Sequence, residues 1–241
     1  MQQQQNYQLL GGDPRLTLDG LTGADLQKLG ADSLADVLGV RLFDTRRFKK
    51  ATAFPKGEVS YFTVPVNQKQ ALANDSATEY LKTRIDTNNK HAGQLPRGVT
   101  VKVMSLQARL IITNTNDTAE TAALVSDPTP LTSDEVTTNV GNLIEAFMSS
   151  CYVEFKVGGK TYEEGLLEHF PAKYGVSGFA GAADEAIVQN GFGRAWNFPI
   201  PRWIDAGRSF EVLVTNYNQF TVTRSCKLRF TLECLAHRSI Q

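Results

Sequence analysis

A segment near the end of the chain alternates strictly between apolar and polar residues. The apolar positions are Cys226, Leu228, Phe230, Leu232 and Cys234, and the polar positions are Lys227, Arg229, Thr231 and Glu233. Because successive side chains of an extended chain point to opposite faces, we expect a strand with one face in a core and the other in water. Half-solvated strands of this kind are typical of antiparallel sheets. The sequence therefore predicts that the chain ends in an antiparallel β-sandwich or barrel.

The same alternation predicts further strands upstream. Together with the segment above, they occupy residues 60–66, 101–113, 151–157, 196–200, 209–215, 220–224 and 226–235. In the strand at 101–113 the shared face is formed by Met104, Leu106, Ala108, Leu110 and Ile112. After 151–157, Gly158 and Gly159 supply the positive φ angles of a tight hairpin, and Lys160 starts the return strand. About eight to ten strands without a fixed-period repeat predict a mainly β protein.

Helices are expected only in the connections between strands. Apolar residues at helical spacing predict one broken helix or two short ones at 22–40, interrupted at Gly30. A short helix is expected within 71–85, with Leu72, Tyr80 and Leu81 facing inward, and others at 140–149 and 184–189.

The domain organisation follows from composition. Residues 1–20 are rich in glutamine and lack apolar periodicity, so they are expected to be a flexible N-terminal arm, either frayed or extended across a neighbouring subunit. Residues 21–241 are expected to form one β-sandwich domain, with a subdivision near 114–138 left open. Residues 67–99 form a long polar excursion of the kind that carries function or packs against partners. No signal peptide or membrane span is predicted.

The balance of charged residues narrows the class of protein. The 25 Lys and Arg residues balance the 25 Asp and Glu residues, which excludes a chain-wide attraction to nucleic acid. One local basic cluster contains Arg41, Arg46, Arg47, Lys49 and Lys50, interleaved with Phe43 and Phe48. It is interpreted either as a contact for phosphates or lipid headgroups or as a solvated strand or loop face.

The three cysteines are an odd number, which excludes a complete disulfide framework. Cys226 and Cys234 would lie about 26 Å apart on one extended strand, too far to bond. We expect buried free thiols in a protein that folds in a reducing compartment.

No motif with a catalytic mechanism is found. The phosphate-binding loop is missing, and the glycines of 175–178 do not have the spacing of a nucleophile elbow. His91, His169 and His237 are too widely spaced for a sequence-local metal site. We therefore predict no catalytic residue, no metal site, no cofactor and no enzymatic activity.

Two weaker functional interpretations remain. Glu163, Glu164 and Glu168 allow a β-sandwich hydrolase with two carboxylates, although adjacent glutamates on a strand point to opposite faces. Trp196 and Trp203 allow a sugar-binding platform, with core packing or subunit contact as the alternative.

Turn and strand residues also recur in four spaced stretches. They are Leu42-Phe43-Asp44-Thr45 with Phe54-Pro55 and residues 61–65; Thr87-Asn88 with residues 92–96; residues 155–162 with Pro171; and Pro199-Ile200-Pro201 with Phe210-Glu211-Val212 and residues 237–241. Over residues 40–241 this pattern resembles the jelly-roll major capsid proteins of small tailless icosahedral bacteriophages. The resemblance implies a mainly β, antiparallel β-sandwich of jelly-roll type, single or compact double, with short helices in loops.

What the resemblance implies about function is a viral structural protein. It would be the major capsid subunit, made in the host cytoplasm and self-assembling with other capsid proteins into an icosahedral shell through trimers or pseudo-hexameric capsomers. No small-molecule substrate is implied. Zero net charge argues against a basic-armed coat protein, so a lipid layer or an internal protein is expected beneath the shell, and any nucleic-acid contact would use Arg46, Arg47, Lys49 and Lys50. The alternatives are a lectin-like carbohydrate-binding or receptor-binding module of a virion, and the hydrolase.

Overall fold

The computed structural model describes residues 21, 23–31, 37–112, 141–171 and 196–237. The helices in this part of the chain are α1 (Gly23–Leu29), α2 (Gly141–Ser150) and the short 3-10 helix η5 (Leu167–His169). The strands are β1 (Val37–Phe48), β2 (Thr52–Phe54), β3 (Gly57–Tyr61), β4 (Lys69–Ala71), β5 (Glu79–Leu81), β6 (Val101–Ile112), β7 (Cys151–Val157), β8 (Lys160–Leu166), β9 (Trp196–Ile204), β10 (Phe210–Asn216), β11 (Phe220–Val222) and β12 (Cys226–His237).

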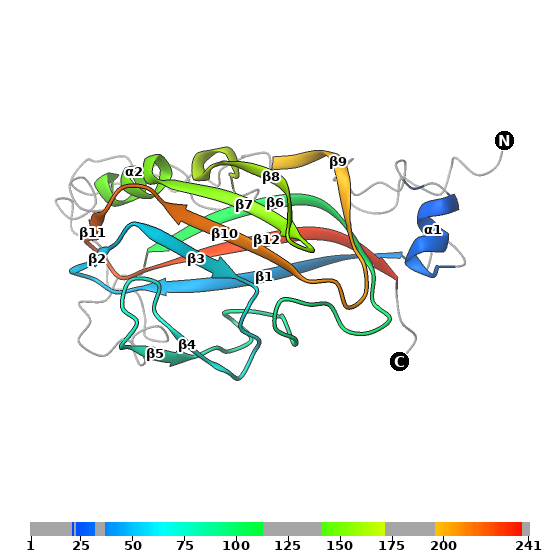
Figure 1. Cartoon of the computed structure of the whole chain (residues 1–241), viewed down its shortest axis with the longest axis horizontal. Coiled ribbons are helices and arrows are strands. Elements are labelled where there is room, and N and C mark those ends of the chain that lie inside the picture. Colours follow the sequence, from blue (N-terminus) through cyan, green and yellow to red (C-terminus); the bar gives the residue numbers. More distant parts are fainter. Residues whose placement is uncertain (1–20, 22, 32–36, 113–140, 172–195, 238–241) are drawn as a thin grey trace, which may run out of the picture.

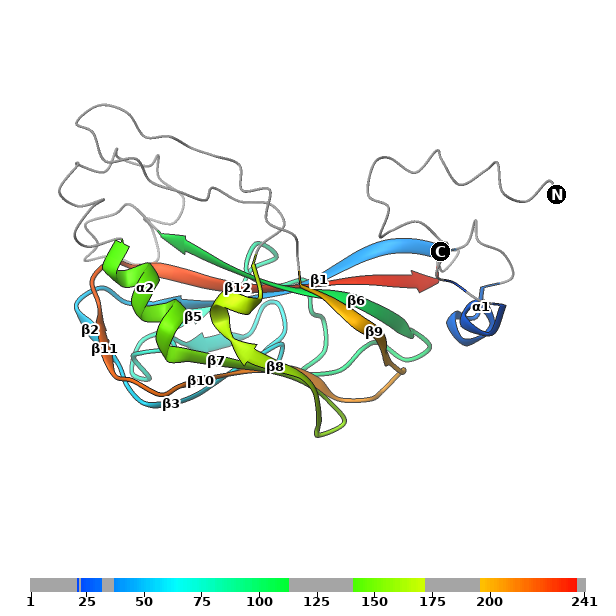
Figure 2. The same ribbon diagram turned by 90° about the horizontal axis from the view of Figure 1, so that it is seen from above.

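Eight of these strands form two antiparallel sheets that pack face to face (Figures 1 and 2). Sheet A has the order β1-β12-β6-β9, and sheet C has the order β3-β10-β7-β8. Two further pairs, β11-β2 and β4-β5, are small two-stranded sheets. The predicted mainly β, antiparallel β-sandwich is confirmed. None of the described helices is long and apolar enough to span a membrane.

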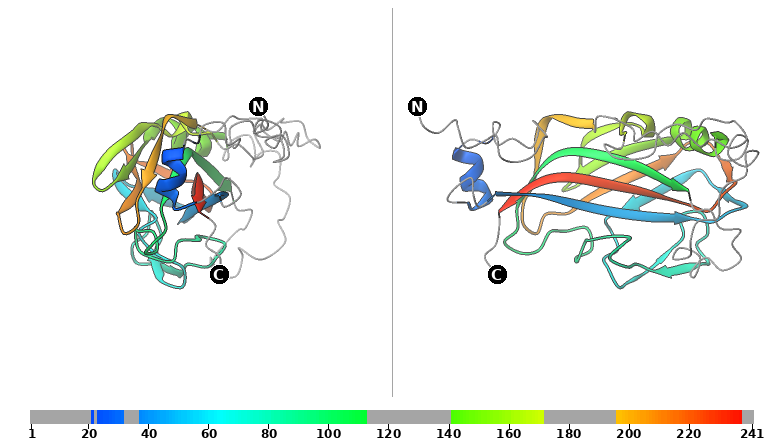
Figure 3. Two further views of the ribbon diagram at one scale, coloured as in Figure 1. Left: turned by 90° about the vertical axis from the view of Figure 1, so that its right-hand side faces the viewer. Right: turned by 180° about the vertical axis from the view of Figure 1, so that it is seen from behind.

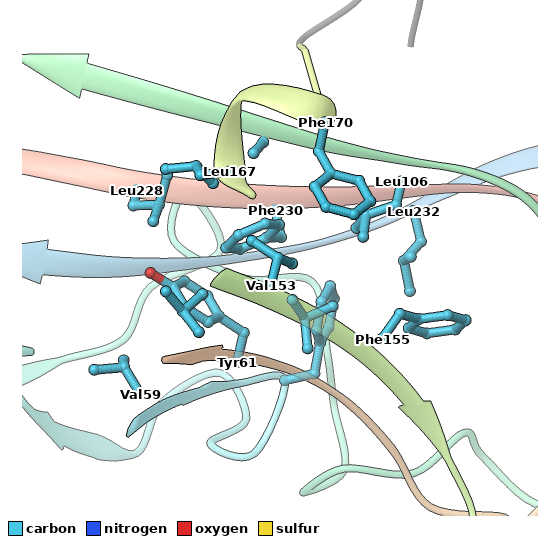
Figure 4. Packing of buried hydrophobic residues seen from close by; sticks show 14 of the residues in the cluster. Val59, Tyr61, Leu106, Val153, Phe155, Leu167, Phe170, Leu228, Phe230 and Leu232 are labelled. Atoms are coloured by element: carbon cyan, nitrogen blue, oxygen red, sulfur yellow. The ribbon is translucent and has the colours of Figure 1, made fainter. Parts of the chain in front are cut away.

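The core lies between the inner faces of the two sheets (Figure 4). Phe230 of β12 and Tyr61 of β3 meet across it edge to face, with ring centroids 4.7 Å apart, and both side chains are completely buried. Aromatic pairs in this geometry add to the free energy gained from burying their area. The core is a single cluster to which strands before residue 113 and after residue 140 both contribute.

Several sequence predictions are confirmed in detail. Strand β12 alternates between buried and half-buried residues from Cys226 to Leu232, as the sequence pattern predicts. Helix α2 buries Leu143 and Phe147 against the core. All three cysteines are free and buried. The predicted arm at 1–20, the segment 114–138 and the helical turn at 184–189 lie outside the described residues.

The hairpin between β7 and β8 turns at Gly158 and Gly159, as predicted. Their φ angles are +60° and +78°, a region that side chains with a Cβ rarely adopt. A Cβ on Gly158 would also lie 2.6 Å from Nε of Arg208.

Replacing both glycines by valine is therefore expected to destabilise the protein by about 1–3 kcal/mol for each residue held at positive φ. Chemical unfolding followed by circular dichroism measures the change. Lys160→Ala, an exposed substitution beside the turn, is the control and should leave the unfolding midpoint almost unchanged. A double variant as stable as the parent would contradict the assignment.

The helix predicted over 22–40 is wrong at residues 37–40. Among the described residues of this segment, Gly23–Leu29 are helical and the helix ends at Gly30 with a φ of +75°, while Val37–Val40 belong to β1; residues 32–36 lie outside the described part. These residues extend because β12 offers them a full set of antiparallel partners, from His237 opposite Val37 onward. Tertiary pairing here overrides the helical spacing of the apolar residues.

Three smaller predictions also need correction. The strand expected at 60–66 ends at Tyr61, because Phe62 has a φ of +69°. The helix expected within 71–85 is absent from these residues, which contain the end of β4, turns and β5, and Leu81 is 55% exposed rather than inward. In β6 a bulge opposite Glu233 and Cys234 leaves Met104 without a partner in β12. Met104 is therefore not on the inner face that the sequence pattern predicts for it.

The segment between β3 and β6, residues 62–99, covers one long side of the sandwich (Figures 1 and 3). It pairs with the free edge of β1 through a bridge between Asp44 and Thr87. The side chain of Asn88 accepts from the backbone N–H of Phe43 at 2.9 Å and donates to the carbonyl of Arg41. An unpaired edge strand is a template for association, so this cover removes an edge that another chain would otherwise extend.

Candidate functional site

The carboxylates considered for a hydrolase do not face one another. Glu163 points toward the sheet interface and contacts Arg202 of β9, with Oε1 3.5 Å from Nη2. Glu164 lies on the outer face of sheet C, directly opposite Glu154. Glu168 is exposed in η5, where its Oε1 lies 3.8 Å from Nε2 of His169. The opposite orientations of Glu163 and Glu164 agree with the sequence prediction, and the three groups form no common site.

The histidines are equally separate. His91 lies in the segment 62–99, His169 in η5 and His237 at the end of β12. Within the described ranges, no group of three or more His, Cys, Asp or Glu side chains is arranged to hold a metal ion.

Trp203 does not present a free ring to solvent. The ammonium of Lys28 in α1 lies 4.7 Å from the ring centroid, and that of Lys102 lies 5.7 Å away. Lys28 and Lys102 also pair with Asp205 at 3.4 Å and with Asp25 at 3.2 Å. This arrangement fastens α1 to one end of sheet A, which assigns Trp203 to packing. The side chain of Trp196 lies outside the described part of the structure.

Three members of the predicted basic cluster, Arg41, Arg46 and Arg47, lie in β1, and Lys49 and Lys50 follow it. Arg47 and Lys49 are paired with carboxylates of the segment 62–99, Asp86 and Asp75, each at 2.9 Å. Arg41 lies 3.6 Å from Glu233. The cluster is thus partly exposed, as the interpretation as a solvated strand or loop face expects, but three of its cations lie beside carboxylates. A phosphate or lipid contact through this cluster stays a prediction, with Arg47 and Lys49 already engaged by ion pairs.

The most unusual cluster of charged groups lies between the sheets at the β1 edge. Asp44 sits on the inner face of β1, opposite Phe230, and Lys82 reaches it from the segment 62–99. Both side chains are completely buried. Asp44 also accepts a hydrogen bond from the backbone N–H of Phe62 at 2.6 Å, and Lys82 lies 3.4 Å from the carbonyl of Val64. The pair therefore joins β1, the end of β3 and the long segment at one point.

A second ion pair lies on the other side of the same strand. The guanidinium of Arg47 holds both oxygens of Asp86, with Nη2 at 3.0 and 2.9 Å. Asp86 also accepts hydrogen bonds from the backbone N–H and hydroxyl of Thr83 at 3.1 and 2.9 Å. The guanidinium lies over the Tyr80 ring, 4.3 Å from its centroid. The two pairs together hold residues 80–87 against β1.

The electrostatics of the two pairs differ. Burial raises the pKa of Asp44 and lowers the pKa of Lys82, while each partner's charge opposes that change. Burial alone would also raise the pKa of Asp86, but the N–H of Thr83 and the Arg47 guanidinium outweigh it and lower that pKa. Asp44 and Lys82 are thus costly to keep charged, whereas the Asp86 carboxylate is stabilised by the fold.

Acidification is expected to weaken the attachment of residues 80–87. Because the folded pKa of Asp86 is depressed, its contribution is present above the unfolded pKa of about 3.9 and is lost as the pH falls through the folded value. The unfolding free energy measured between pH 6 and pH 3 should therefore fall less steeply for Asp86→Asn than for the parent. Identical slopes would contradict the assignment. Lys69→Gln, at an exposed pair, is the control.

Polar atoms without partners lie around the Asp44–Lys82 pair. Among the described residues, Nε of Arg46, the hydroxyl of Tyr61 and Nε2 of Gln70 are buried and make no hydrogen bond. Buried polar groups of this kind usually bind ordered water. Asp44 and Lys82 are completely buried, so this ion pair joins segments of the chain and does not contact a substrate.

A small hollow lies beside the β7–β8 hairpin. Its volume is about 210 Å³, and it is lined in part by Thr63, Gly93, Lys156, Ser209 and Glu211. Ligand pockets for drug-sized molecules are typically larger, about 300–1,000 Å³. Lys156, its cation, is already 3.2 Å from Glu154.

The three cysteine thiols are expected to be unreactive. Burial raises the pKa of Cys151 to about 12, and it raises those of Cys226 and Cys234 further. A thiol must lose its proton to act as a nucleophile or a metal ligand, so these groups behave as small apolar side chains.

Comparison with known proteins finds no family model, no curated protein and no solved structure that matches this chain. The assignment of function therefore depends on the fold and on the surfaces of this molecule.

Sequence reasoning missed Asp44 and Lys82 as a pair. Their separation of 38 residues gives no local pattern, and Asp44 interrupts the apolar inner face of β1. The available signal was the alternation of Val40, Leu42 and Phe48, which marks 40–48 as a strand and places Asp44 on its core side.

Proposed function

We propose that this chain is the major capsid subunit of a virion and that it self-assembles into an icosahedral shell. The observation that carries the proposal is the order in which the strands pair. The eight sandwich strands, taken along the chain, are β1, β3, β6, β7, β8, β9, β10 and β12. The first pairs with the last, the second with the seventh, the third with the sixth and the fourth with the fifth.

This nested pairing supports a jelly roll, an eight-stranded double sheet that is used by viral capsid and lectin domains. Eight strands in two four-stranded sheets favour a single jelly roll over a compact double one. The fold alone does not separate a shell protein from a lectin. The covered edge of β1 and the surface charges must therefore be considered as well.

Contacts within the chain join the two sheets on both sides of the sandwich. Residues 62–99 cover the β1 side, with Lys82 and Asp44 between the sheets. On the opposite side Arg202 of β9 contacts Glu163 of β8, and its guanidinium lies 5.1 Å from the centroid of the Tyr162 ring. Covering of the β1 edge limits open-ended pairing at that edge. Neighbours in a closed shell would then be contacted through loops and faces.

The experiment is to express the full chain and examine its assembly. We expect trimers, pseudo-hexameric capsomers or closed shells by light scattering and negative-stain microscopy. Removing residues 1–20 should leave the circular dichroism of the sandwich unchanged and should weaken or misdirect assembly. A protein that stays monomeric at high concentration and binds glycans saturably would overturn the proposal in favour of the lectin-like module.

A further inference from the structure

The outer faces of the two sheets carry opposite charge. The outer positions of sheet C hold Glu58, Glu154, Glu164 and Glu211, together with Lys156. The outer positions of sheet A between Arg41 and Phe48 of β1 and their partners hold Arg41, Arg47, Arg109, Lys227 and Arg229, together with Glu233. A chain with zero formal net charge therefore folds into a sandwich with an acidic face and a basic face.

The basic face places like charges directly opposite each other on neighbouring strands. Arg47 of β1 is in register with Lys227 of β12, and Arg229 of β12 is in register with Arg109 of β6. Like charges in directly opposite positions destabilise a sheet. We call these four residues the cationic patch. The outward positions of a strand need only be polar. Strand formation therefore does not require like charges at these four positions.

Carboxylates of the described residues neutralise one of the four cations. Arg47 is paired with Asp86. Arg229 donates to neutral oxygens, the Thr45 hydroxyl at 2.9 Å and the Ile85 carbonyl at 2.6 Å, and lies 5.0 Å from the Phe43 ring centroid.

The other cations have no acidic partner within the described ranges. Arg109 is exposed and Lys227 is half-buried. Neither of them, nor Arg229, forms an ion pair with a described carboxylate. Burial and Arg47 lower the pKa of Lys227, and burial and Arg109 lower that of Arg229, although the charge of Asp86 opposes both changes and that of Asp44 opposes the second. The patch is thus short of negative charge.

We propose that the cationic patch binds the phosphate backbone of packaged nucleic acid, so that the outer face of sheet A lines the inside of the shell. This inference rests on the proposed function for its orientation. Arginine binds phosphate in a planar, two-pronged geometry, and three of the four cations are arginines. Lys227 and Arg229 stand two residues apart on one strand, about 6.8 Å, which suits successive phosphates of an extended strand.

The nature of the patch also limits what it recognises. Its cations lie on the broad face of a sheet, with no helix to enter a groove, so contacts are expected to reach phosphates rather than base edges. Binding should therefore be independent of sequence and strongly dependent on salt. An anionic lipid surface is the competing occupant. Surface cations attract anionic lipid as well, but the fixed spacing of Lys227 and Arg229 along one strand favours the evenly spaced phosphates of a nucleic acid over a fluid layer of headgroups.

The test measures binding of a fluorescent single-stranded oligonucleotide to the full chain as a function of salt concentration. The double variant Arg109→Gln/Lys227→Gln removes two cations without breaking a described hydrogen bond or ion pair. If both cations neutralise phosphates, the slope of log affinity against log salt should become shallower by about 1.4, at about 0.7 for each phosphate that is no longer neutralised. The matched control is Lys56→Gln/Lys160→Gln, which removes the same charge from exposed positions away from sheet A.

The outcomes separate the alternatives. A smaller slope for the patch variant alone supports the proposal. Equal slopes for all proteins, equal losses in both variants, or no oligonucleotide binding by the parent would overturn it, as would binding to vesicles containing anionic lipid without binding to the oligonucleotide. The oligonucleotide assay does not require shells, so its failure is distinguishable from a failure to assemble. If shells form, those of the patch variant should show a lower ratio of absorbance at 260 to 280 nm than those of the control.

Discussion

Replacing Asp44 by alanine is expected to lower the free energy of unfolding by about 3–5 kcal/mol. The substitution leaves the ammonium of Lys82 buried between the sheets without its counter-charge, and it also removes the acceptor for the backbone N–H of Phe62. Stability measured by urea unfolding, with circular dichroism as the signal, reports the loss. Because Lys82 lies in the segment 62–99, proteolysis within that segment should also accelerate.

A double variant isolates the ion pair from general damage to the core. Asp44→Asn/Lys82→Met removes both charges and keeps similar side-chain volumes, so it should be more stable than Asp44→Asn alone. The pair Lys69 and Glu79 is the control, since both side chains are largely exposed and their charged atoms are 3.9 Å apart. Lys69→Met should have little effect. A double variant no more stable than Asp44→Asn would show that the buried charges are not coupled.

Replacing Phe230 by alanine is expected to lower the free energy of unfolding by about 3–5 kcal/mol, as for other truncations of buried aromatic side chains. Phe230 is completely buried at the centre of the core, where its ring meets Tyr61 at 4.7 Å between centroids (Figure 4). The substitution leaves a cavity in a region where strands from both sheets are fixed by their pairing. The unfolding midpoint in urea is the measurement.

The control for Phe230 is its neighbour Thr231, which lies on the opposite face of β12 and is half-buried. Thr231→Ala should change the midpoint little. Arg229→Ala, which the sequence alone suggests as a neutral change, is a poorer control because Arg229 hydrogen-bonds to Thr45 and Ile85. Comparable midpoints for Phe230→Ala and Thr231→Ala would contradict the assigned faces of β12.

Local sequence was sufficient wherever one strand has one dry face and one wet face. The alternation from Cys226 to Leu232, the apolar side of α2 and the two glycines of the β7–β8 turn each depend on neighbours a few residues away. Side-chain direction and φ preference are local properties, and a pattern at short range therefore predicts them.

The same reasoning failed where a distant partner decided the conformation. Val37 and Leu38 have helical spacing with the residues before them, yet they extend because β12 pairs with them from about 200 residues further along the chain. Met104 leaves the inner face because a bulge shifts the register between β6 and β12. Neither the partner strand nor its register is encoded in a short window.

The sequence by itself thus determined the class of the fold, a mainly β, antiparallel sandwich, because alternation and turn residues are short-range signals. Only the tertiary structure decided which charges meet. It buried Asp44 with Lys82, paired Arg47 with Asp86, and placed Lys227 opposite Arg47 and Arg229 opposite Arg109. Electrostatic energy depends on the distance between charges and on their burial, and the totals of 25 cations and 25 anions contain neither quantity. A chain of zero net charge can therefore have one basic face and one acidic face.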